Sequence, residues 1–286
     1  MLKLGRQNFD DDALLIMAIV NRTPDSFYDR GATYEFDLAL QRVHDVVRDG
    51  AEIVDIGGVK AAPGATVTVD EEIARTASLV AAVRADFPDV AISVDTWRHE
   101  VGEAACHAGA DILNDAWGGW DPALAEVAAR FGAALVCTHA GGVEPRTRPH
   151  RVCYEDIVAD VLARTVVEAE RAVALGVDPD SVLIDPGHDF GKNTRHSLEV
   201  TRRLADLVAS GWPVLVSLSN KDFVGETLGR PVGERLLGTL AATSISAWLG
   251  ARVFRAHNIA ETRQTLDMVA AIRGTRPPAR TVRGLA

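Results

Sequence analysis

The feature that most constrains this chain is a repeated unit. It consists of a short apolar segment, a polar residue at the segment's carboxyl end, and then a helical pattern. Residues 53–65 show the unit well, because Ile53, Val54 and Ile56 flank one acid, Asp55, and two glycines and a Pro-Gly follow. An acid at the end of an apolar strand, followed by backbone that can approach a ligand closely, marks the place where parallel α/β proteins carry out chemistry.

The unit recurs eight times along the chain. The predicted strands cover residues 14–20, 53–56, 91–96, 111–115, 135–139, 182–184, 213–218 and 251–254. Helical patterns that follow them include 37–48, 70–84, a short helix ending near 107, 155–175, 195–209 and 261–272. Eight strand–helix units in 286 residues predict a single (β/α)₈ TIM barrel, whose usual size is ~250 residues.

A doubly wound open sheet is the competing architecture. It is disfavoured because no Gly-x-Gly-x-x-Gly turn follows the first strand. No linker divides the chain, so we expect one domain over residues 1–273, opening with a polar lead before the first strand. Residues 274–286 contain two prolines and scattered arginines, which predicts a flexible tail.

Composition narrows the class of protein. With 47% hydrophobic and 24% charged residues, the chain is typical of soluble globular proteins, and its formal charge of −10 argues against general nucleic-acid binding. The apolar run 14–20 is too short to span a membrane and follows three acids. Cys106, Cys137 and Cys153 form no Cys-x-x-Cys pair, which favours the reducing cytoplasm.

Polar residues stand at the ends of all the predicted strands, and in a barrel these ends surround one mouth. They are Asn21, Asp55, Asp95, Asn114, His139, Asp185, Lys221, Arg255 and His257. Asp95, Asn114 and Asp185 suit a flat heterocycle with several N–H donors, because each unpaired buried polar edge would cost ~1–3 kcal/mol.

Lys221, Arg255 and His257 form the cationic part of this ring. Arg255 and His257 are two residues apart on one strand, so their side chains point the same way and suit an anion such as a phosphate.

These segments together resemble the dihydropteroate synthase family along nearly the whole chain. The resemblance rests on Asn21 with Thr-Pro-Asp-Ser-Phe at 23–27, Asp-Ile-Gly-Gly at 55–58 with Pro-Gly-Ala at 63–65, Ser-Val-Asp-Thr at 93–96, Asn114-Asp115, Asp-Pro-Gly at 185–187 with Phe-Gly-Lys at 190–192, residues 219–223, and Arg-Ala-His at 255–257. Their order along the chain makes them far more specific than any one alone.

The resemblance implies a role for each residue of the ring. It implies that a dihydropterin ring is held by Asp95, Asn114, Asp185 and Lys221, and that Asn21, Arg255 and His257 surround its diphosphate and a Mg²⁺ ion. Lys221, Arg255 and His257 are then the expected catalytic residues. In the family, pyrophosphate leaves the pterin and the amine of 4-aminobenzoate attacks the resulting cationic carbon, while Mg²⁺ and fixed cations stabilise the leaving group.

The chain departs from the family pattern in its second loop. The family has Glu-Ser-Thr-Arg where this chain has Val59, Lys60, Ala61 and Ala62. The two alanines remove a hydroxyl and a bidentate anion clamp that, in the family, help to frame 4-aminobenzoate and pyrophosphate. Lys60 is a poor substitute for a guanidinium because its charge is a single point on a flexible stem.

Other departures affect mainly the entrance to the site. The family's Ser-Arg-Lys-Ser-Phe reads Ser-Asn-Lys-Asp-Phe at 219–223, so that Asn220 replaces an arginine and Asp222 introduces a charge expected to repel an anion. Thr138 stands where a methionine usually packs on the pterin, and Asn258 replaces an aspartate. His188-Asp189 interrupts the usual Gly-Phe-Gly run.

Three functions remain open. We expect a divergent paralogue that keeps the pterin site and lacks normal synthase activity. A working synthase is the alternative, with Arg146, Arg148 and Arg151 of the fifth loop as a replacement clamp. A pterin-binding methyltransfer module is disfavoured, because no cobalamin-binding segment follows and the segment around Lys221 resembles the synthases.

Some of these residues have simpler interpretations. Asp55 either binds loop N–H groups or contacts the ligand. His139 is either a satisfied histidine at the barrel mouth or a ligand contact, and it is left out of the predicted site. Asp115 is expected to support the site from behind. The apolar stripe Leu240, Ile245, Trp248 and Leu249 is expected to be mostly core. The family commonly dimerises through helices in this region, so we expect a homodimer.

Overall fold

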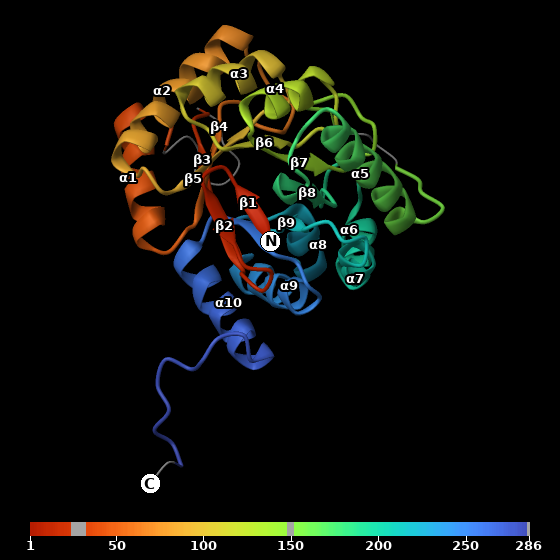
Figure 1. Cartoon of the computed structure of the whole chain (residues 1–286). Coiled ribbons are helices and arrows are strands. Elements are labelled where there is room, and N and C mark those ends of the chain that lie inside the picture. The colour runs from red at the N-terminus through yellow and green to blue at the C-terminus, as the bar shows by residue number, and fades with distance from the viewer. Residues whose placement is uncertain (24–32, 148–151, 285–286) are drawn as a thin grey trace.

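The computed structural model describes residues 1–23, 33–147 and 152–284, and it shows the predicted barrel (Figure 1). Eight parallel strands form a sheet in the order β8-β7-β6-β5-β4-β3-β10-β9. The sheet closes where Ile184 N donates to Pro213 O at 3.0 Å and Ile184 bridges Val214. Helices surround this cylinder, and the single-barrel prediction is confirmed.

The barrel strands are β3 (Leu15–Asn21), β4 (Ile53–Gly57), β5 (Ala91–Asp95), β6 (Ile112–Asp115), β7 (Ala134–Thr138), β8 (Val182–Asp185), β9 (Leu215–Ser217) and β10 (Val253–Ala256). The helices are α1 (Phe36–Arg48), α2 (Val69–Asp86), α3 (His99–Ala108), α4 (Ala123–Phe131), α5 (Ile157–Ala174), α6 (Thr194–Arg202), α7 (Leu204–Val208), α8 (Asp222–Leu228), α9 (Leu236–Trp248) and α10 (Ile259–Arg273), with a short 3₁₀ turn at Pro179–Ser181.

One predicted helix is in fact two. Residues 195–209 divide into α6 and α7 at Arg203, whose backbone leaves the helical region (φ −103°, ψ 24°). The Arg203 guanidinium reaches both carboxylate oxygens of Asp156 at 3.0 Å, at the start of α5. The break thus coincides with a contact to a residue far away in the sequence. Residues 195–209 contain no Gly or Pro from which the break could be predicted.

The alternation of side chains along the strands divides the core into two layers. Residues facing outward pack beneath the helices, as Val54 and Ile92 do. Residues facing inward fill the lower barrel, as Met17, Ile53 and Ile112 do. The same alternation turns the polar residues near the strand ends inward. The barrel interior is therefore apolar in its lower layer, at the amino ends of the strands, and polar at their carboxyl ends.

The N-terminal segment is an antiparallel hairpin and not the expected polar lead. It consists of β1 (Leu2–Leu4) and β2 (Gln7–Phe9), joined through Gly5, whose φ of +59° is one that glycine adopts without strain. Leu2 and Leu4 are fully buried with the inward-facing strand residues. The hairpin therefore closes the end of the barrel opposite the carboxyl ends of the strands, and Figure 1 shows it in front of the barrel.

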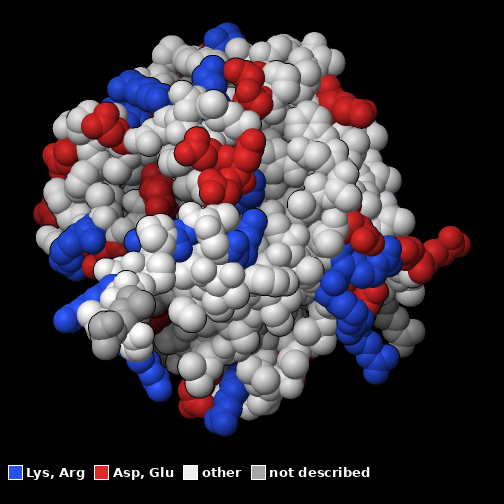
Figure 2. Space-filling view, turned by 60° about the horizontal axis from the view of Figure 1, so that its bottom comes forward, with Lys and Arg blue, Asp and Glu red and all other residues white. Residues whose placement is uncertain are grey.

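Helix α9 exposes its large apolar residues and buries small ones. Its buried side chains are Thr239, Thr243, Ser246 and Ala247. In the predicted stripe, Ile245 and Trp248 are 52% and 59% exposed, and Leu240 and Leu249 are only partly buried, so the expectation that it is mostly core is wrong. Leu237 of the same helix is 83% exposed. On the neighbouring α10, Met268 and Ile272 are also exposed. Figure 2 turns the lower part of Figure 1, where α9 and α10 lie, toward the viewer, and this face has a broad area without Lys, Arg, Asp or Glu.

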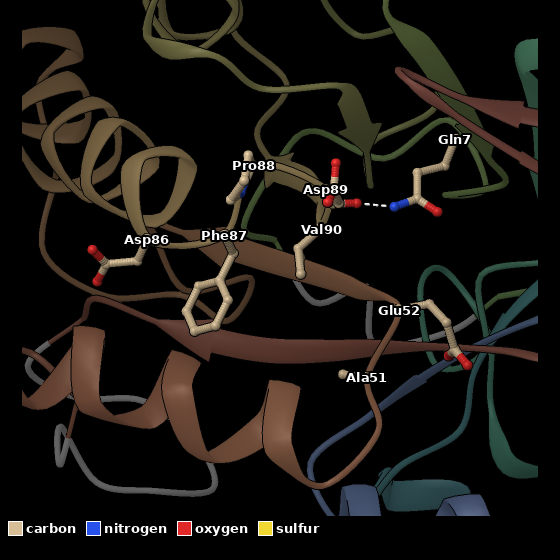
Figure 3. Close-up of a pocket in the computed structure, with 8 residues that line it drawn as sticks. All are labelled: Gln7, Ala51, Glu52, Asp86, Phe87, Pro88, Asp89 and Val90. Carbon is tan, nitrogen blue, oxygen red and sulfur yellow. Dashed lines mark hydrogen bonds between the residues drawn. The ribbon is translucent and has the colours of Figure 1, made fainter.

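A cavity of ≈ 340 Å³ lies at the opposite end from the strand carboxyl ends (Figure 3). Its lining residues come just before β4 and β5, as Glu52 and Val90 do, and from β2, where Gln7 donates to Asp89 O. In barrels of this kind the N-terminal face contributes to stability and the other face to chemistry. This cavity is therefore part of the structural end of the molecule.

Residues 274–284 are exposed and lead away from α10 (Figure 1), and their flexibility stays a prediction. Within the described part of the chain, no helix combines the length and apolar character needed to cross a bilayer.

The buried hairpin gives a first testable expectation. Leu4→Ala should lower the free energy of unfolding by about 2–5 kcal/mol, because it leaves a cavity in the closed lower end of the barrel. Urea denaturation measures the change. Val282→Ala, in the exposed tail, should stay within about 0.5 kcal/mol of the parent protein. Equal effects of the two variants would show that the hairpin adds nothing to the core.

Candidate functional site at the mouth of the barrel

The strand ends gather the predicted residues at one mouth. Asn21 is in register with Gly57, Gly57 with Asp95, and Asp95 with Asn114, so one row of the sheet connects three of them. Asp185 ends β8, and Arg255 lies on β10 beside β3. His257 follows β10 immediately, and Lys221 comes four residues after the end of β9, at the start of α8. The ring predicted from the sequence is therefore assembled.

Arg255 lies at the centre of this ring between two carboxylates. Its Nε donates to Asp55 Oδ2 at 2.6 Å, and its Nη2 donates to Asp95 Oδ2 at 2.7 Å. Asp55 is fully buried and also accepts from Ser93 Oγ at 2.6 Å and, more weakly, from Asn114 Nδ2 at 3.4 Å. Asp55 thus binds two ring residues, Arg255 and Asn114, together with Ser93. Its partners in the described structure are side chains and not the loop N–H groups that the sequence suggested.

Because Asp95 and Arg255 form a salt bridge, the charge of each affects the pKa of the other. Burial raises the pKa of Asp95 to about 7, with help from the negative charges of Asp55 and Glu72 and against the attraction of Arg255. Burial opposes charge on Arg255, but Asp55 and Asp95 outweigh that effect and raise the Arg255 pKa. Asp95 can therefore hold a proton near neutrality, whereas Arg255 always carries its charge.

Asp185 and Lys221 lie on the other side of the mouth, where the charge of each acts on the other. Asp185 Oδ1 accepts from Gly187 N at 2.7 Å, and burial raises the pKa of this carboxyl. Lys221 Nζ donates to His188 O at 2.7 Å and lies 4.4 Å from the centre of the Phe190 ring. Burial lowers the pKa of Lys221. A flat ring bound here would meet an acceptor, a donor and an aromatic wall.

Asp189, which departs from the family pattern, has a structural task. Its Oδ2 accepts from the backbone N–H groups of Asp222 at 2.7 Å and Phe223 at 3.3 Å, at the start of α8. It does this with a φ of +68°, a region that aspartate visits more readily than most residues. The loop after β8 is thereby fastened to the loop that carries Lys221.

His257 does not carry the charge expected of it. Burial, followed by the charge of Arg255, lowers its pKa to about 3, so the ring is neutral at neutral pH. Its Nδ1 lies 2.9 Å from Ser219 Oγ. His257 can offer a phosphate an N–H donor, while Arg255 and Lys221 provide the positive charge. We therefore revise the cationic group to these two residues.

Two residues placed outside the site stay outside it. His139 has a partner at each ring nitrogen, Lys192 Nζ at 2.6 Å and Asp160 Oδ1 at 2.7 Å, so the satisfied histidine is the correct one of its two interpretations. Asp115 accepts from Trp117 N at 2.9 Å and from the following loop, so it supports the turn after β6.

Arginine side chains hold the backbone of the second loop. Arg146 of the fifth loop donates through Nη1 to Ala65 O at 2.8 Å and through Nε to Ala62 O at 3.4 Å. Arg75 donates to Gly58 O at 2.8 Å, and Arg98 donates to Val67 O at 3.0 Å. Arg146 therefore reaches the vacated position but is engaged by the loop backbone. Arg148 and Arg151 lie outside the described residues.

A guanidinium also lies beside Asn220. Arg235 is buried and donates through Nη1 to Asn220 O and to Asp222 Oδ1, each at 2.9 Å, and through Nε to Arg230 O at 3.2 Å. The charge of Asp222 is thus paired within the protein, so the expected repulsion of an incoming anion is weakened. The same hydrogen bonds occupy the Arg235 guanidinium with acceptors inside the protein.

Asn21 has an amide oxygen of the type that Mg²⁺ accepts as a ligand. Its amide oxygen lies against the Cα of Gly57, in space that a Cβ at Gly57 would enter at 2.8 Å. Mg²⁺ commonly completes its coordination with substrate phosphates and water, so a single protein oxygen is compatible with it. The neighbouring carboxylates Asp55 and Asp95 are bound to Arg255 and are not free to act as ligands.

Comparison with known proteins agrees with this geometry. The family profile described as "Pterin binding enzyme" matches residues 17–257. "Inactive dihydropteroate synthase 2" of Mycobacterium leprae is 60% identical over 279 residues, covering 96% of each chain. "Dihydropteroate synthase" of Haemophilus influenzae is 35% identical over 254 residues, which is 88% of this chain and 92% of that one. The chain belongs to the dihydropteroate synthase family.

Solved structures of dihydropteroate synthases have the same fold. The enzyme of Yersinia pestis, in a sulfonamide drug complex, has a TM-score of 0.91 at 34% identity over 96% of this chain and all of that one. Mycobacterium tuberculosis Rv1207 has a TM-score of 0.74 at 47% identity over 97% of this chain and all of that one. This chain is thus a divergent member of the dihydropteroate synthase family.

The contacts of Arg255 lead to a prediction on stability. Arg255→Met should lower the free energy of unfolding by about 3–5 kcal/mol, because it leaves Asp55 charged, buried and without its cation. Chemical denaturation measures the loss, and adding Asp55→Asn should recover part of it. Arg202→Met removes an arginine paired on the surface with Glu199 and should change stability by less than about 1 kcal/mol. A stable Arg255→Met protein would contradict the central role of this contact.

Proposed function

We propose that this protein binds a reduced pterin at the mouth of the barrel and does not condense it with 4-aminobenzoate at a useful rate. The observation that carries the proposal is an asymmetry. On one side, Asp95, Asn114 and Asp185 are all present, and each makes a hydrogen bond within the protein. On the other side, the two guanidinium groups near the vacated positions, Arg146 and Arg235, are engaged by protein oxygens.

The missing contacts are sufficient to suppress turnover. Ala61, Ala62 and Asn220 stand where the family pattern has Thr, Arg and Arg. A loss of ~1–3 kcal/mol at each position would lower the rate by several orders of magnitude if the losses add. The mycobacterial relatives named as inactive synthases, at 60% identity, support this assignment.

Mg²⁺, if bound with the diphosphate at Asn21, would neutralise charge on the leaving oxygens. The residues of this chain would do the rest. Lys221 and the Nη1 group of Arg255, which Asp55 and Asp95 leave unused, would face the negative charge. His257 would donate one hydrogen bond to it. Asp185 and Asn114 would orient the ring. Among the described residues of the entrance, Arg146 and Arg235 would then be held by the protein and would not position an aromatic amine for attack.

Binding and turnover can be separated by experiment. In calorimetry, 6-hydroxymethyl-7,8-dihydropterin diphosphate with Mg²⁺ should bind, and Asp185→Asn should weaken binding by at least tenfold because a buried charged acceptor is lost. Under the same conditions 4-aminobenzoate should yield no dihydropteroate. Ala61→Thr combined with Ala62→Arg should raise any residual rate.

Two results would overturn the proposal. Absence of pterin binding would remove its first half. Turnover at the rate of a working synthase assayed alongside would remove the second half and favour the alternative, an active synthase in which Arg146 and Arg235 exchange their internal partners for the substrate carboxylate. Tight binding of a methylated folate would instead favour a methyltransfer module.

We also propose a homodimer in the cytoplasm. The exposed Leu237, Ile245 and Trp248 of α9, beside Met268 and Ile272 of α10, form an apolar surface of the kind that a second subunit covers. The free cysteines Cys106, Cys137 and Cys153 accord with a reducing compartment. Sedimentation should give a dimer, and Trp248→Glu with Leu237→Glu should shift it to a monomer. A monomeric parent protein would refute this.

A further inference from the structure

One polar atom at the mouth has no partner. Thr138 ends β7, and only 4% of this residue is exposed. Its hydroxyl Oγ1 is buried and makes no hydrogen bond within the described part of the chain. A buried hydroxyl is normally satisfied, because leaving it unpaired costs stability in the folded protein. An orphaned donor inside a binding pocket therefore suggests a missing ligand atom.

The register places this hydroxyl beside the proposed pterin site. Ala134 and Val136 of β7 face the barrel interior, so Thr138, two residues further on, faces the same way. Thr138 is in register with Asp185 on β8. Its Cγ2 lies near Gly187, where an added Cβ would approach to 3.1 Å. The hydroxyl and the Asp185 carboxylate thus occupy neighbouring inward-facing positions at the carboxyl ends of β7 and β8.

The two groups have complementary chemistry. An ionised carboxylate only accepts hydrogen bonds, whereas a threonine hydroxyl can also donate one. Asp185 Oδ1 is already occupied by Gly187 N, and the carboxylate has a second oxygen to offer a ligand donor. Together, the two positions match a ring edge on which an N–H donor stands next to a carbonyl or ring-nitrogen acceptor.

We propose that Thr138 is a specificity-determining residue that donates a hydrogen bond to the acceptor on this ring edge, while Asp185 accepts from the adjacent N–H. The ligand class is a flat heterocycle with a lactam-like edge, such as a pterin, so the inference rests on the proposed function. It adds that this chain reads one more atom of the ring through β7. The hydroxyl remains unpaired until the ligand arrives.

Thr138→Val tests this, because it removes the hydroxyl and keeps the shape of the side chain. Calorimetry with 6-hydroxymethyl-7,8-dihydropterin diphosphate should show about 5–10-fold weaker binding. Thr138→Ser, which keeps the hydroxyl, should bind within about threefold of the parent protein. Without ligand, Thr138→Val should be more stable, with Tm raised by about 2–4 °C, since it no longer buries an unpaired hydroxyl.

Ser246→Ala is the matched control. Ser246 of α9 also has a fully buried hydroxyl with no partner among the described residues, but it lies outside the ring of strand ends. Its removal should leave the pterin affinity unchanged. The proposal fails if Thr138→Val binds as tightly as the parent protein, or if Thr138→Ser loses as much affinity as Thr138→Val. If the parent protein binds no pterin, it is the proposed function that fails.

Discussion

The contact of Arg255 with both Asp55 and Asp95 is the constraint on which the mouth of this barrel depends. Burying three charges is expensive, and the arrangement persists only because each carboxylate has a short, direct hydrogen bond to the same guanidinium. Asp55, placed lowest and fully buried, ties together three strands through Ser93, Asn114 and Arg255. The position of every ligand-facing group on this side follows from that anchor.

A second set of contacts determines what the entrance can do. In this chain arginines bind loop carbonyls: Arg75, Arg98 and Arg146 hold the second loop, and Arg235 holds the turn at Asn220. A guanidinium that satisfies backbone oxygens must release them before it can bind a carboxylate from outside. The loss of the family's Thr and Arg is thus accompanied by a loop whose backbone is held by the protein itself. The physical consequence is that these arginines, in the described part of the entrance, are already occupied and have little left to offer an anion.

Sequence reasoning reached the barrel and the ring of strand ends because both depend on local patterns. β-branched runs ending in a polar residue are visible in any one segment, and parallel strands bring their ends together by topology alone. The hairpin was missed because its strands have three residues each, although Leu2 and Leu4 alternate around Lys3 before Gly5. The partners of Arg146 and the double contact of Arg255 join residues 81 to 200 positions apart. The outward-facing Ile245 and Trp248 were predicted to be core because apolar character alone does not show which side of a helix faces solvent.

The two sides of the mouth differ in a way that stability alone does not explain. If the pocket had no ligand, replacing the costly groups with apolar residues would stabilise the fold, since a buried acid with a raised pKa and a buried hydroxyl without a partner both weaken it. Asp95, Asp185 and Thr138 are nevertheless all present, whereas the entrance has lost polar groups such as those replaced by Ala61 and Ala62. Costly features are expected where function requires them. This pattern accords with the proposed function, in which the site holds a ring and does not join a second molecule to it.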